Sequence, residues 1–319
     1  MRTGARRTSG TPPKKASGAA GRTRDLQSAA AGLRGEVRFA APLQDYTSFR
    51  IGGPADALVK PADVEDLARL VVQARAAHVP LFVIGGTNLL VRDGGIRGIV
   101  VNLSRLNRIQ DEDGGVVYAE GGVGMPTLMK HAMSRSLAGL EWAAGIPGTV
   151  AGCVVMNAGT RLGEMKDALK AVRLVDPRGT IVDVPASAIR FHYRQALLPR
   201  GIVVGAWLSL KPASKEKIET VVKEYLRHRK ETQPLAQPSA GCVFKNPGRE
   251  AAGRLIESVG LKGARIGDAQ VSEKHANFMV NVGHATAADV IALIKKVGRT
   301  VEDRTGITLE LELKIVGQP

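Results

Sequence analysis

Two glycine-rich loops in the first half of the chain constrain its fold more than any other feature. Residues 84–90 (Ile-Gly-Gly-Thr-Asn-Leu-Leu) directly follow the apolar run 80–84, and residues 144–152 (Ala-Gly-Ile-Pro-Gly-Thr-Val-Ala-Gly) precede the Met-Asn-Ala-Gly run 156–159. Glycines let the backbone approach a phosphate, and successive free N–H groups form an anion-binding concavity. Neither loop matches the dinucleotide fingerprint or the P-loop, so either one alone could be a structural turn. The two together favour a nucleotide-sized cofactor.

Helix and strand patterns alternate along the chain without the regular strand-helix-strand order of a doubly wound fold. Helical spacing of apolar residues predicts helices at 62–77, 126–137, 215–231, 252–259 and 286–304, with Asp63 and Asp66 stabilising the start of the first. Apolar runs predict strands at 80–84, 99–103, 116–119, 171–175, 180–184 and 202–210. Strict alternation over 307–316 predicts one further strand, with Glu310 and Glu312 on its polar face. We therefore expect an α+β fold.

The chain divides into three predicted parts: a tail over residues 1–34, a domain over 35–211 and a smaller domain over 212–319. The tail holds eight Lys or Arg against one acid and is rich in Gly, Ala, Ser, Thr and Pro. Such a composition buries too little apolar surface to offset the entropy of ordering, so we expect the tail to be disordered. A basic tail can tether nucleic acid or an anionic surface. The lack of aromatic residues and of repeats argues against a nucleic-acid partner.

The remaining composition points to an intracellular protein. The chain has only two cysteines, Cys153 and Cys242, far apart and in no metal-ligand spacing. This usage fits a reducing cytoplasm and predicts no metal site. No apolar run reaches the roughly 18 to 20 residues of a membrane span, and no apolar segment follows the basic N-terminus, so we expect neither membrane insertion nor secretion. The formal net charge of +15 suits anionic ligands.

An ordered set of short motifs resembles the UDP-N-acetylenolpyruvoylglucosamine reductase family. The matching segments are Thr47–Gly53, Gly85–Leu90, Gly145–Val150, Met156–Gly159, Tyr193-Arg194, Ser239–Pro247, Leu255–Glu257, Gly260–Gly263, Val271–Asn277 and Leu309–Glu312. Each motif is weak alone, but the set occurs in the family's order over nearly the whole chain beyond the tail.

The resemblance implies a fold and a reaction. The fold is a two-subdomain FAD-binding domain of the vanillyl-alcohol-oxidase (PCMH) type, followed by a smaller α/β substrate-binding domain. The implied reaction is reduction of the enolpyruvyl ether of UDP-N-acetylglucosamine to UDP-N-acetylmuramate for peptidoglycan. FAD would be bound noncovalently and NADPH would donate the hydride. The short connection after Arg194 resembles the family's compact subclass, and a monomer in the bacterial cytoplasm is expected.

The resemblance also assigns ligand contacts. For the cofactor these are Arg50, Gly52, Gly85, Gly86, Thr87, Asn88, Leu89, Gly145, Ile146, Pro147, Gly148, Thr149, Gly152, Asn157, Ala158 and Gly159. For the UDP-sugar substrate they are Tyr193, Arg194, Lys245 and Asn246, with His275 and Asn277 expected near the same cleft.

Three residues match the family's catalytic positions. Arg194 would face the negative charge that develops beside the substrate carboxylate, and Glu312 would assist it. Cys242 stands where many family members have the proton-donating Ser, and its thiol is the stronger acid. An isolated Arg or strand Glu is more often structural, and an intracellular Cys is usually inert. The motif positions favour catalysis over these readings, and Glu310 is the nearest alternative to Glu312. A reactive Cys242 would also predict oxidative inactivation.

Two other functions stay open at this point. Another FAD-dependent oxidoreductase of the same fold would keep both glycine loops but would lack the Cys242, Lys245, Asn246 and Glu312 set. A non-enzymatic anion-binding protein would explain the tail but not the loops. The chain also departs from the family where Gln195-Ala196 follows the Tyr-Arg motif, which leaves one contact in that turn without a counterpart.

Overall fold

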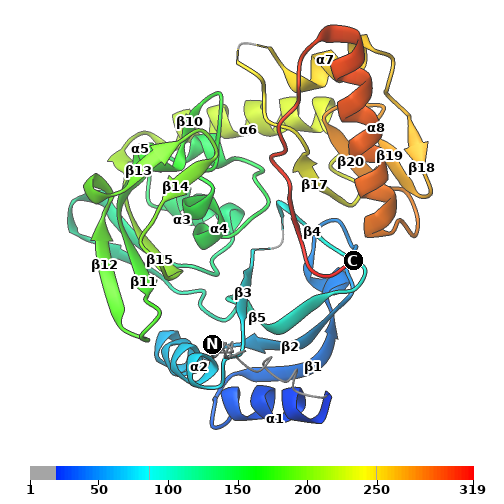
Figure 1. Cartoon of the computed structure of the whole chain (residues 1–319). Helices are drawn as coiled ribbons and strands as arrows, with labels where there is room; N and C mark the ends of the chain where they lie inside the picture. Colours follow the sequence, from blue (N-terminus) through cyan, green and yellow to red (C-terminus); the bar gives the residue numbers. More distant parts are fainter. Residues whose placement is uncertain (1–18, 86, 249) are drawn as a thin grey trace, which may run out of the picture.

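The computed structural model describes residues 19–85, 87–248 and 250–319, which form three packed units (Figure 1). One hydrophobic core is shared by the first two units, and another lies within the first unit. The core of the third unit also includes Phe49, Ile51 and Leu90 of the first. The mixed helix and strand content confirms the predicted α+β class. In the described ranges, no helix is long and apolar enough to cross a membrane.

The first unit is a four-stranded sheet covered by two helices. Its strands lie in the order β1 (Glu36–Pro42), β2 (Pro54–Lys60), β5 (Ile96–Asn102) and β3 (Leu81–Ile84), with β1 antiparallel to the rest. Helix α2 (Val64–Ala76) begins as predicted, because the Asp63 side chain accepts the backbone N–H of Asp66. The Asp66 carboxylate in turn accepts the N–H groups of Arg34, Gly35 and Ala62, which ties the chain before β1 to the helix.

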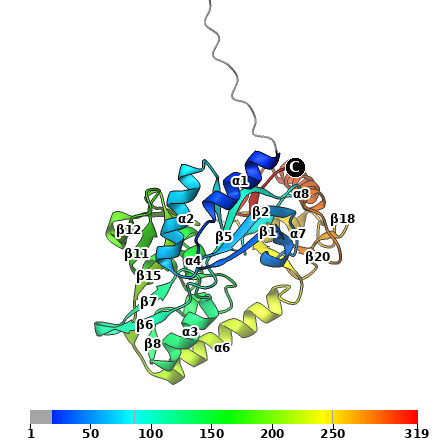
Figure 2. The same ribbon diagram turned by 90° about the horizontal axis from the view of Figure 1, so that it is seen from below.

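Helix α1 (Ala19–Ala29) corrects the prediction of a disordered tail over 1–34. The helix lies beside α2 (Figure 2), and Leu26 and Ala29 are buried in the core that it shares with α2. Two apolar positions one turn apart were enough to dock a segment whose overall composition is polar. Residues 1–18 lie outside the described residues.

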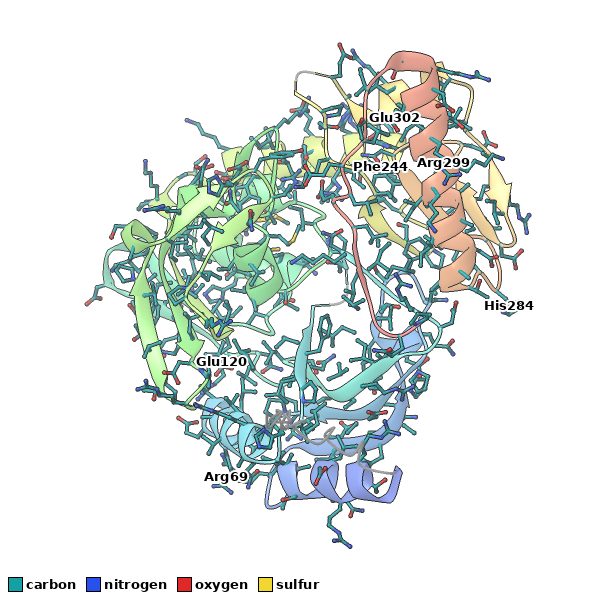
Figure 3. All side chains as sticks on the ribbon, viewed as in Figure 1. Arg69, Glu120, Phe244, His284, Arg299 and Glu302 are labelled. Atoms are coloured by element: carbon teal, nitrogen blue, oxygen red, sulfur yellow. The ribbon has the colours of Figure 1, made fainter. Side chains whose placement is uncertain are left out.

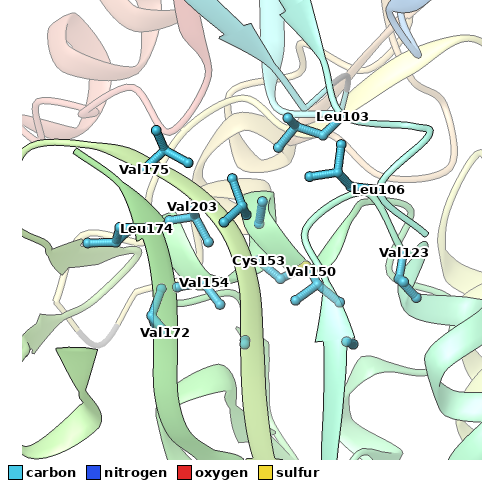
Figure 4. Close-up of a cluster of buried hydrophobic side chains, with 14 of the residues drawn as sticks. Leu103, Leu106, Val123, Val150, Cys153, Val154, Val172, Leu174, Val175 and Val203 are labelled. Atoms are coloured by element: carbon cyan, nitrogen blue, oxygen red, sulfur yellow. The ribbon is translucent and has the colours of Figure 1, made fainter. Parts of the chain in front are cut away.

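The second unit is a five-stranded antiparallel sheet in the order β12-β11-β15-β7-β6. Its strands are β6 (Ile109–Glu112), β7 (Val116–Glu120), β11 (Leu169–Val175), β12 (Ile181–Pro185) and β15 (Ile202–Ser209). The last four lie close to predicted runs, whereas β6 was not predicted. The sheet packs on α4 (Val150–Val155), and Figure 4 shows Cys153 of this helix among the buried aliphatic side chains. Cys153 therefore has the packing role expected of a buried thiol.

Helix α3 (Met125–Ser134) ends earlier than predicted. Ser136 adopts a left-handed φ of 56°, and β8 (Leu137–Ala138) then pairs with β16 (Lys211–Pro212). The short elements that follow α4 are β9 (Gly159–Thr160), β10 (Gly163–Glu164), α5 (Met165–Ala168), β13 (Arg190–His192) and β14 (Gln195–Leu197).

Helix α6 (Lys215–Thr232) moves the boundary between the units. Its buried residues Ile218, Val222 and Tyr225 pack with Met129 of α3 and with Ala144, so the helix belongs to the first two units (Figure 2). The predicted division at 211/212 therefore falls one helix too early. In the sequence, the end of the strand pattern at β16 is easier to recognise than the apolar face of α6.

The third unit is a four-stranded sheet covered by two helices. Its strands lie in the order β17 (Ser239–Cys242), β20 (Phe278–Asn281), β19 (Ala269–Val271) and β18 (Arg265–Ile266), with α7 (Ala252–Ser258) and α8 (Ala287–Thr305) packed against them. Asp93 of the first unit accepts the N–H groups of Ala287 and Ala288 at the start of α8. The units are therefore joined by specific capping contacts as well as by packing.

The final segment is not the single long strand that its alternation predicts. Only β21 (Lys314–Val316) is a regular strand, and it pairs in parallel with β4 (Leu89–Val91) of the first glycine loop. Before it, residues 307–313 cross between the second and third units (Figure 1), with an isolated bridge between Leu311 and Phe244. The residues of this alternating segment instead contact two partners, Phe244 in the third unit and β4 in the first glycine loop.

Candidate active site

Arg194 lies at the tip of the hairpin formed by β13 and β14. Tyr193 and Arg194 form its two-residue turn, since His192 pairs directly with Gln195. Arg194 holds a left-handed φ of 59°, a conformation that costs a non-glycine residue on the order of 1–3 kcal/mol. Its guanidinium stacks on the Tyr193 ring at 4.9 Å. The two-residue turn therefore fixes the direction of the Arg194 side chain, and this placement requires a strained backbone at Arg194.

Cys242 and Glu312 are brought together by a short two-stranded contact. The N–H of Lys245 donates to the Glu310 carbonyl at 2.8 Å, and the N–H of Glu312 donates to the Val243 carbonyl at 2.9 Å. Phe244, which is labelled in Figure 3, pairs with Leu311 through an isolated bridge in this contact. Residues 242–245 and 310–312, which are far apart in the sequence, are thus held side by side.

Arg194 and Glu312 form the central ion pair. Nε of Arg194 lies 3.2 Å from Oε1 of Glu312, and both side chains are mostly buried. This Nε–H has no hydrogen-bond acceptor in the structure, so the pair is close without being aligned. Burial raises the pKa of Glu312, although the positive charges of Arg194 and Lys245 oppose the shift. The buried environment therefore favours a proton on Glu312 more than water would.

The Cys242 thiol is held in its protonated form. Burial raises its pKa to about 12, and the nearby charge of Glu312 adds to the shift, while Arg194, Arg229 and a hydrogen bond from Asn277 oppose it. Cys242 nevertheless keeps a partly exposed surface. A thiol that stays protonated at neutral pH fits a proton donor and not a resident thiolate nucleophile.

This pKa changes the expectation of easy oxidation. Since the thiolate is the reactive form, iodoacetamide at neutral pH is expected to alkylate Cys242 on the order of 10³-fold more slowly than a free cysteine. The rate should rise steadily with pH up to the limit of the fold's stability. Peptide mass spectrometry of the modified protein measures this rate at Cys242 separately from Cys153. A rate at pH 7 equal to that of free cysteine would contradict the buried, protonated thiol.

The remaining predicted substrate residues lie around this pair. Lys245 forms an ion pair with Glu310 at 2.5 Å, and the Glu310 side chain is exposed. The Asn246 side-chain carbonyl accepts the N–H of Ala252 and so caps the start of α7. Tyr193 is exposed. Glu312 is thus the more enclosed of the two carboxylates, as the motif position predicts.

The two glycine loops meet at the edge of this site. A Cβ on Gly85 would lie 3.8 Å from Cα of Gly152, and a Cβ on Gly148 would lie 3.3 Å from Oγ1 of Thr87. Small residues here leave backbone uncovered, and Ile146, Pro147, Ala158 and Gly159 along the same loops keep exposed surface. This cradle of bare backbone fits a nucleotide cofactor such as FAD.

Some residues that were predicted to contact the cofactor make other contacts in the structure. The Asn88 side-chain amide donates to the Glu312 carbonyl at 3.0 Å, so it links the first loop to the catalytic segment. Leu89 is buried in the core of the first unit. The hydroxyl of Thr149 accepts the N–H of Gly152 and begins α4. Gly52 approaches Val91 so closely that a Cβ would lie 2.8 Å from the valine Cβ, so packing alone explains this glycine.

Asn157 corrects the predicted list of cofactor contacts. It is fully buried, and its amide donates to the Glu164 carboxylate and to the His192 carbonyl. No surface is left for a direct cofactor contact, so Asn157 instead positions the hairpin that carries Arg194. Arg50 is exposed with a left-handed φ of 54° and remains a candidate contact. Gly86 lies outside the described residues.

Arg229 is a site residue that the sequence analysis missed. It lies on α6, 8% exposed, and has no carboxylate partner within ion-pair distance among the described residues. Its Nη1 donates weakly to the Ala144 carbonyl at 3.4 Å, and its Nε has no acceptor. Burial lowers its pKa, and a Cβ on Gly145 would lie 3.3 Å from its Nε. The only sequence signal was a charged residue at a helical interval from Ile218, Val222 and Tyr225 on the buried face of α6.

His275 and Asn277 do not line a cleft. His275 packs edge-on against Phe278, and burial lowers its pKa. Asn277 is 3% exposed and hydrogen-bonds the backbone of residues 243–244. Both residues support the segment that carries Cys242.

A separate surface cavity of about 420 Å³ contains none of the predicted site residues. It is lined by Arg108, Tyr118 and Arg173, among others. Its two arginines already pair with Glu120 and Asp183. The cavity is therefore not a second charged site. Among the described residues, no group of His, Cys, Asp and Glu could hold a metal ion.

The comparisons with known proteins agree with this geometry. Residues 55–185 match a family model described as an FAD binding domain, and residues 233–316 match the C-terminal domain of UDP-N-acetylenolpyruvoylglucosamine reductase. The chain is 46% identical to the UDP-N-acetylenolpyruvoylglucosamine reductase 2 of Symbiobacterium thermophilum, over 89% of this chain and 93% of that protein. It is 42% identical to the corresponding reductase of Caldanaerobacter subterraneus subsp. tengcongensis, over 89% and 95%.

A solved structure shows the same fold. The crystal structure of the UDP-N-acetylenolpyruvylglucosamine reductase from Thermus caldophilus is similar with a TM-score of 0.76 and 39% identity, covering 89% of this chain and all of that one. The match to residues 233–316 also begins after α6, where the packing places the boundary of the third unit.

Proposed function

Because this chain belongs to the UDP-N-acetylenolpyruvoylglucosamine reductase family, we propose that it reduces enolpyruvyl-UDP-N-acetylglucosamine to UDP-N-acetylmuramate, with FAD as its cofactor and NADPH as the electron donor. The observation that carries this proposal is the convergence of Arg194, Cys242 and Glu312 beside the two glycine loops. A proton donor, a cation and a carboxyl group next to a cofactor cradle are what reduction of a carboxylate-bearing alkene requires.

The charges around the site support an anionic substrate. Arg194 and Lys245 each have one carboxylate partner, whereas Arg229 is buried without one among the described residues. A buried cation is costly unless an anion meets it. The net positive charge near Cys242 therefore suits a substrate with a diphosphate and a carboxylate.

Each residue has a distinct part in the proposed mechanism. FAD, which the two glycine loops would hold, would supply hydride-transfer chemistry to the substrate's enolpyruvyl group. The Cys242 thiol provides a proton to the carbon that bears the carboxylate. The Arg194 guanidinium faces the negative charge that develops on that carboxylate. Glu312, with its raised pKa, returns a proton toward the Cys242 sulfur.

The substrate-binding residues follow from the same arrangement. Lys245 and the exposed amide nitrogen of Asn246 are candidates for the diphosphate and sugar, with Tyr193 at the rim. All three catalytic residues come from one chain, so we propose that the enzyme acts as a monomer. We place the reaction in the bacterial cytoplasm, where NADPH is available.

An anaerobic half-reaction experiment tests the function. The purified protein is reduced with NADPH, enolpyruvyl-UDP-N-acetylglucosamine is added, and the flavin absorbance is followed. Rapid return of the oxidised spectrum with formation of UDP-N-acetylmuramate is the expected result. A flavin that NADPH reduces but that stays bleached after the addition would overturn the substrate assignment while keeping the cofactor. A protein without flavin colour would overturn both.

Glu312 and Glu310 form a matched pair for testing the catalytic carboxyl group. Glu312→Gln is expected to lower turnover at least about tenfold more than Glu310→Gln, because Glu312 is the enclosed partner of Arg194 and Glu310 is exposed. Steady-state kinetics on both variants provides the comparison. A larger loss in Glu310→Gln would reverse the assignment.

A further inference from the structure

The peptide segment that carries the proton donor is poorly fixed by its own strand. Strand β17 pairs with β20 through Ser239 and Val280 and through Cys242 and Phe278, but the register shifts between these two pairs. Gly241, within the shift, has a left-handed φ of 77°. Regular ladder hydrogen bonds therefore do not determine where Cys242 and the residues after it lie.

One buried side-chain amide holds this segment instead. The Asn277 side-chain carbonyl accepts the N–H of Phe244 at 2.9 Å, and its NH₂ group donates to the Phe244 carbonyl at 2.8 Å. The backbone carbonyl of Asn277 accepts the N–H of Val243 at 2.9 Å. Asn277 is 3% exposed, so water does not compete for these bonds.

Val243 and Phe244 also lie against the segment that carries Glu312. The Val243 carbonyl accepts the N–H groups of Glu312 and Leu313. On the opposite side of Phe244, Lys245 bonds the Glu310 carbonyl. Residues 243–244 thus have Asn277 on one edge and the segment 310–313 on the other. Asn277 therefore fixes, from one edge, the segment after Cys242 against which the segment that carries Glu312 is bound on the other edge.

We propose that Asn277 is a positioning residue that sets the placement of Cys242 relative to Glu312, and that its amide is required because one acceptor and one donor act on the N–H and the carbonyl of the same residue, Phe244. This inference rests on the proposed function for its kinetic consequence, but not for its structural one. Asp has the same shape but, when ionised, cannot donate to the Phe244 carbonyl and places two oxygens face to face. Protonated Asp regains one donor and one acceptor.

The chain offers a matched control. Asn281 lies on β20, four residues after Asn277, and is also buried. Its side chain accepts the N–H groups of Gly283 and Ala285 and donates to the Phe49 carbonyl, none of which touches the catalytic residues. We therefore expect Asn277→Asp and Asn281→Asp to lower the stability of the fold by similar amounts. Of these two residues, Asn277 hydrogen-bonds the segment that carries Cys242 and Asn281 does not.

The test compares the two variants in the intact, flavin-loaded protein. NADPH-driven flavin reduction is expected to stay close to wild type in both. Reoxidation by the enolpyruvyl substrate is expected to slow about 10²-fold in Asn277→Asp, as for a reacting group misplaced by about 1 Å. This rate should recover as the pH is lowered, because protonation restores the donor to the introduced Asp. Asn281→Asp should show neither the selective loss nor the recovery.

A second readout separates this inference from the proposed function. Alkylation of Cys242 by iodoacetamide, followed by peptide mass spectrometry, should be altered in Asn277→Asp and unchanged in Asn281→Asp. If wild-type protein fails to reduce the substrate but alkylation changes as stated, the function is wrong and the positioning role stands. Equal effects of the two variants on alkylation and on both half-reactions would reduce Asn277 to a folding role and overturn the inference.

Discussion

Replacing Cys242 by Ala is expected to lower turnover about 10²- to 10⁴-fold, the usual contribution of a general acid, while NADPH still reduces the flavin at the wild-type rate. The Cys242 thiol is protonated at neutral pH and lies close enough to Arg194 and Glu312 for both charges to act on its pKa. Alanine removes the proton and the hydrogen bond with Asn277, while the backbone hydrogen bonds of Val243 and Lys245 that hold the segment remain. Stopped-flow measurement of the two half-reactions locates the defect in the second.

Two variants make the Cys242 result specific. Cys242→Ser keeps an O–H donor in the same place and should retain much of the activity. Cys153→Ala removes the other thiol, which lies in the core of the second unit, and should leave turnover within about twofold of wild type. Unchanged turnover in Cys242→Ala would eliminate the cysteine as proton donor and would leave Glu312 as the candidate.

Replacing Arg194 by Met is expected to lower turnover about 10²- to 10³-fold, the cost of removing one donor to a developing oxyanion. Arg194 forms an ion pair with Glu312, and its backbone is held at a φ of 59°, a strained conformation that directs the side chain into the site. Arg194→Lys should recover only part of the activity, because an ammonium group lacks the planar fork of donors. Steady-state kinetics at saturating NADPH measures both variants.

The control for Arg194 lies on the same hairpin. Arg190 of β13 is exposed, and Arg190→Met should leave activity unchanged. Arg194→Gly removes the side chain and the left-handed strain together, so it should be inactive without loss of thermal stability. An inactive Arg194→Met that also fails to bind flavin would instead indicate a role in folding the hairpin.

Much of the fold follows from local patterns in the sequence. The apolar runs at 171–175 and 202–210 became β11 and β15, and helix starts marked by Asp63 and Thr286 appear where the capping residues stand. The errors concern segments whose partners are distant. The alternation over 307–316 is real, but the residues divide between Phe244 and the first glycine loop instead of forming one sheet. Local pattern does not specify a distant partner.

In the site, too, the sequence predicted individual residues but not the contacts between distant segments. Family motifs located Arg194, Cys242 and Glu312, and the structure brings them together. The motifs could not distinguish residues that touch a ligand from those that hold the touching residues. Asn157 supports the Arg194 hairpin through the His192 carbonyl, although its motif predicted a cofactor contact. Arg229 was missed because a buried cation on an otherwise charged helix has no sequence signature.

The segment 307–316 follows, in chain order, every residue of the site to which it bonds. Ribosomes release a chain from its N-terminus at about 5–20 residues per second, and units fold as they emerge. Both glycine loops, the Arg194 hairpin and Cys242 can therefore be in place while Glu312 is still missing. During synthesis the two glycine loops therefore emerge before the segment that carries Glu312. Under the proposed mechanism, the nascent protein can return a proton to Cys242 only after this segment has crossed between the units.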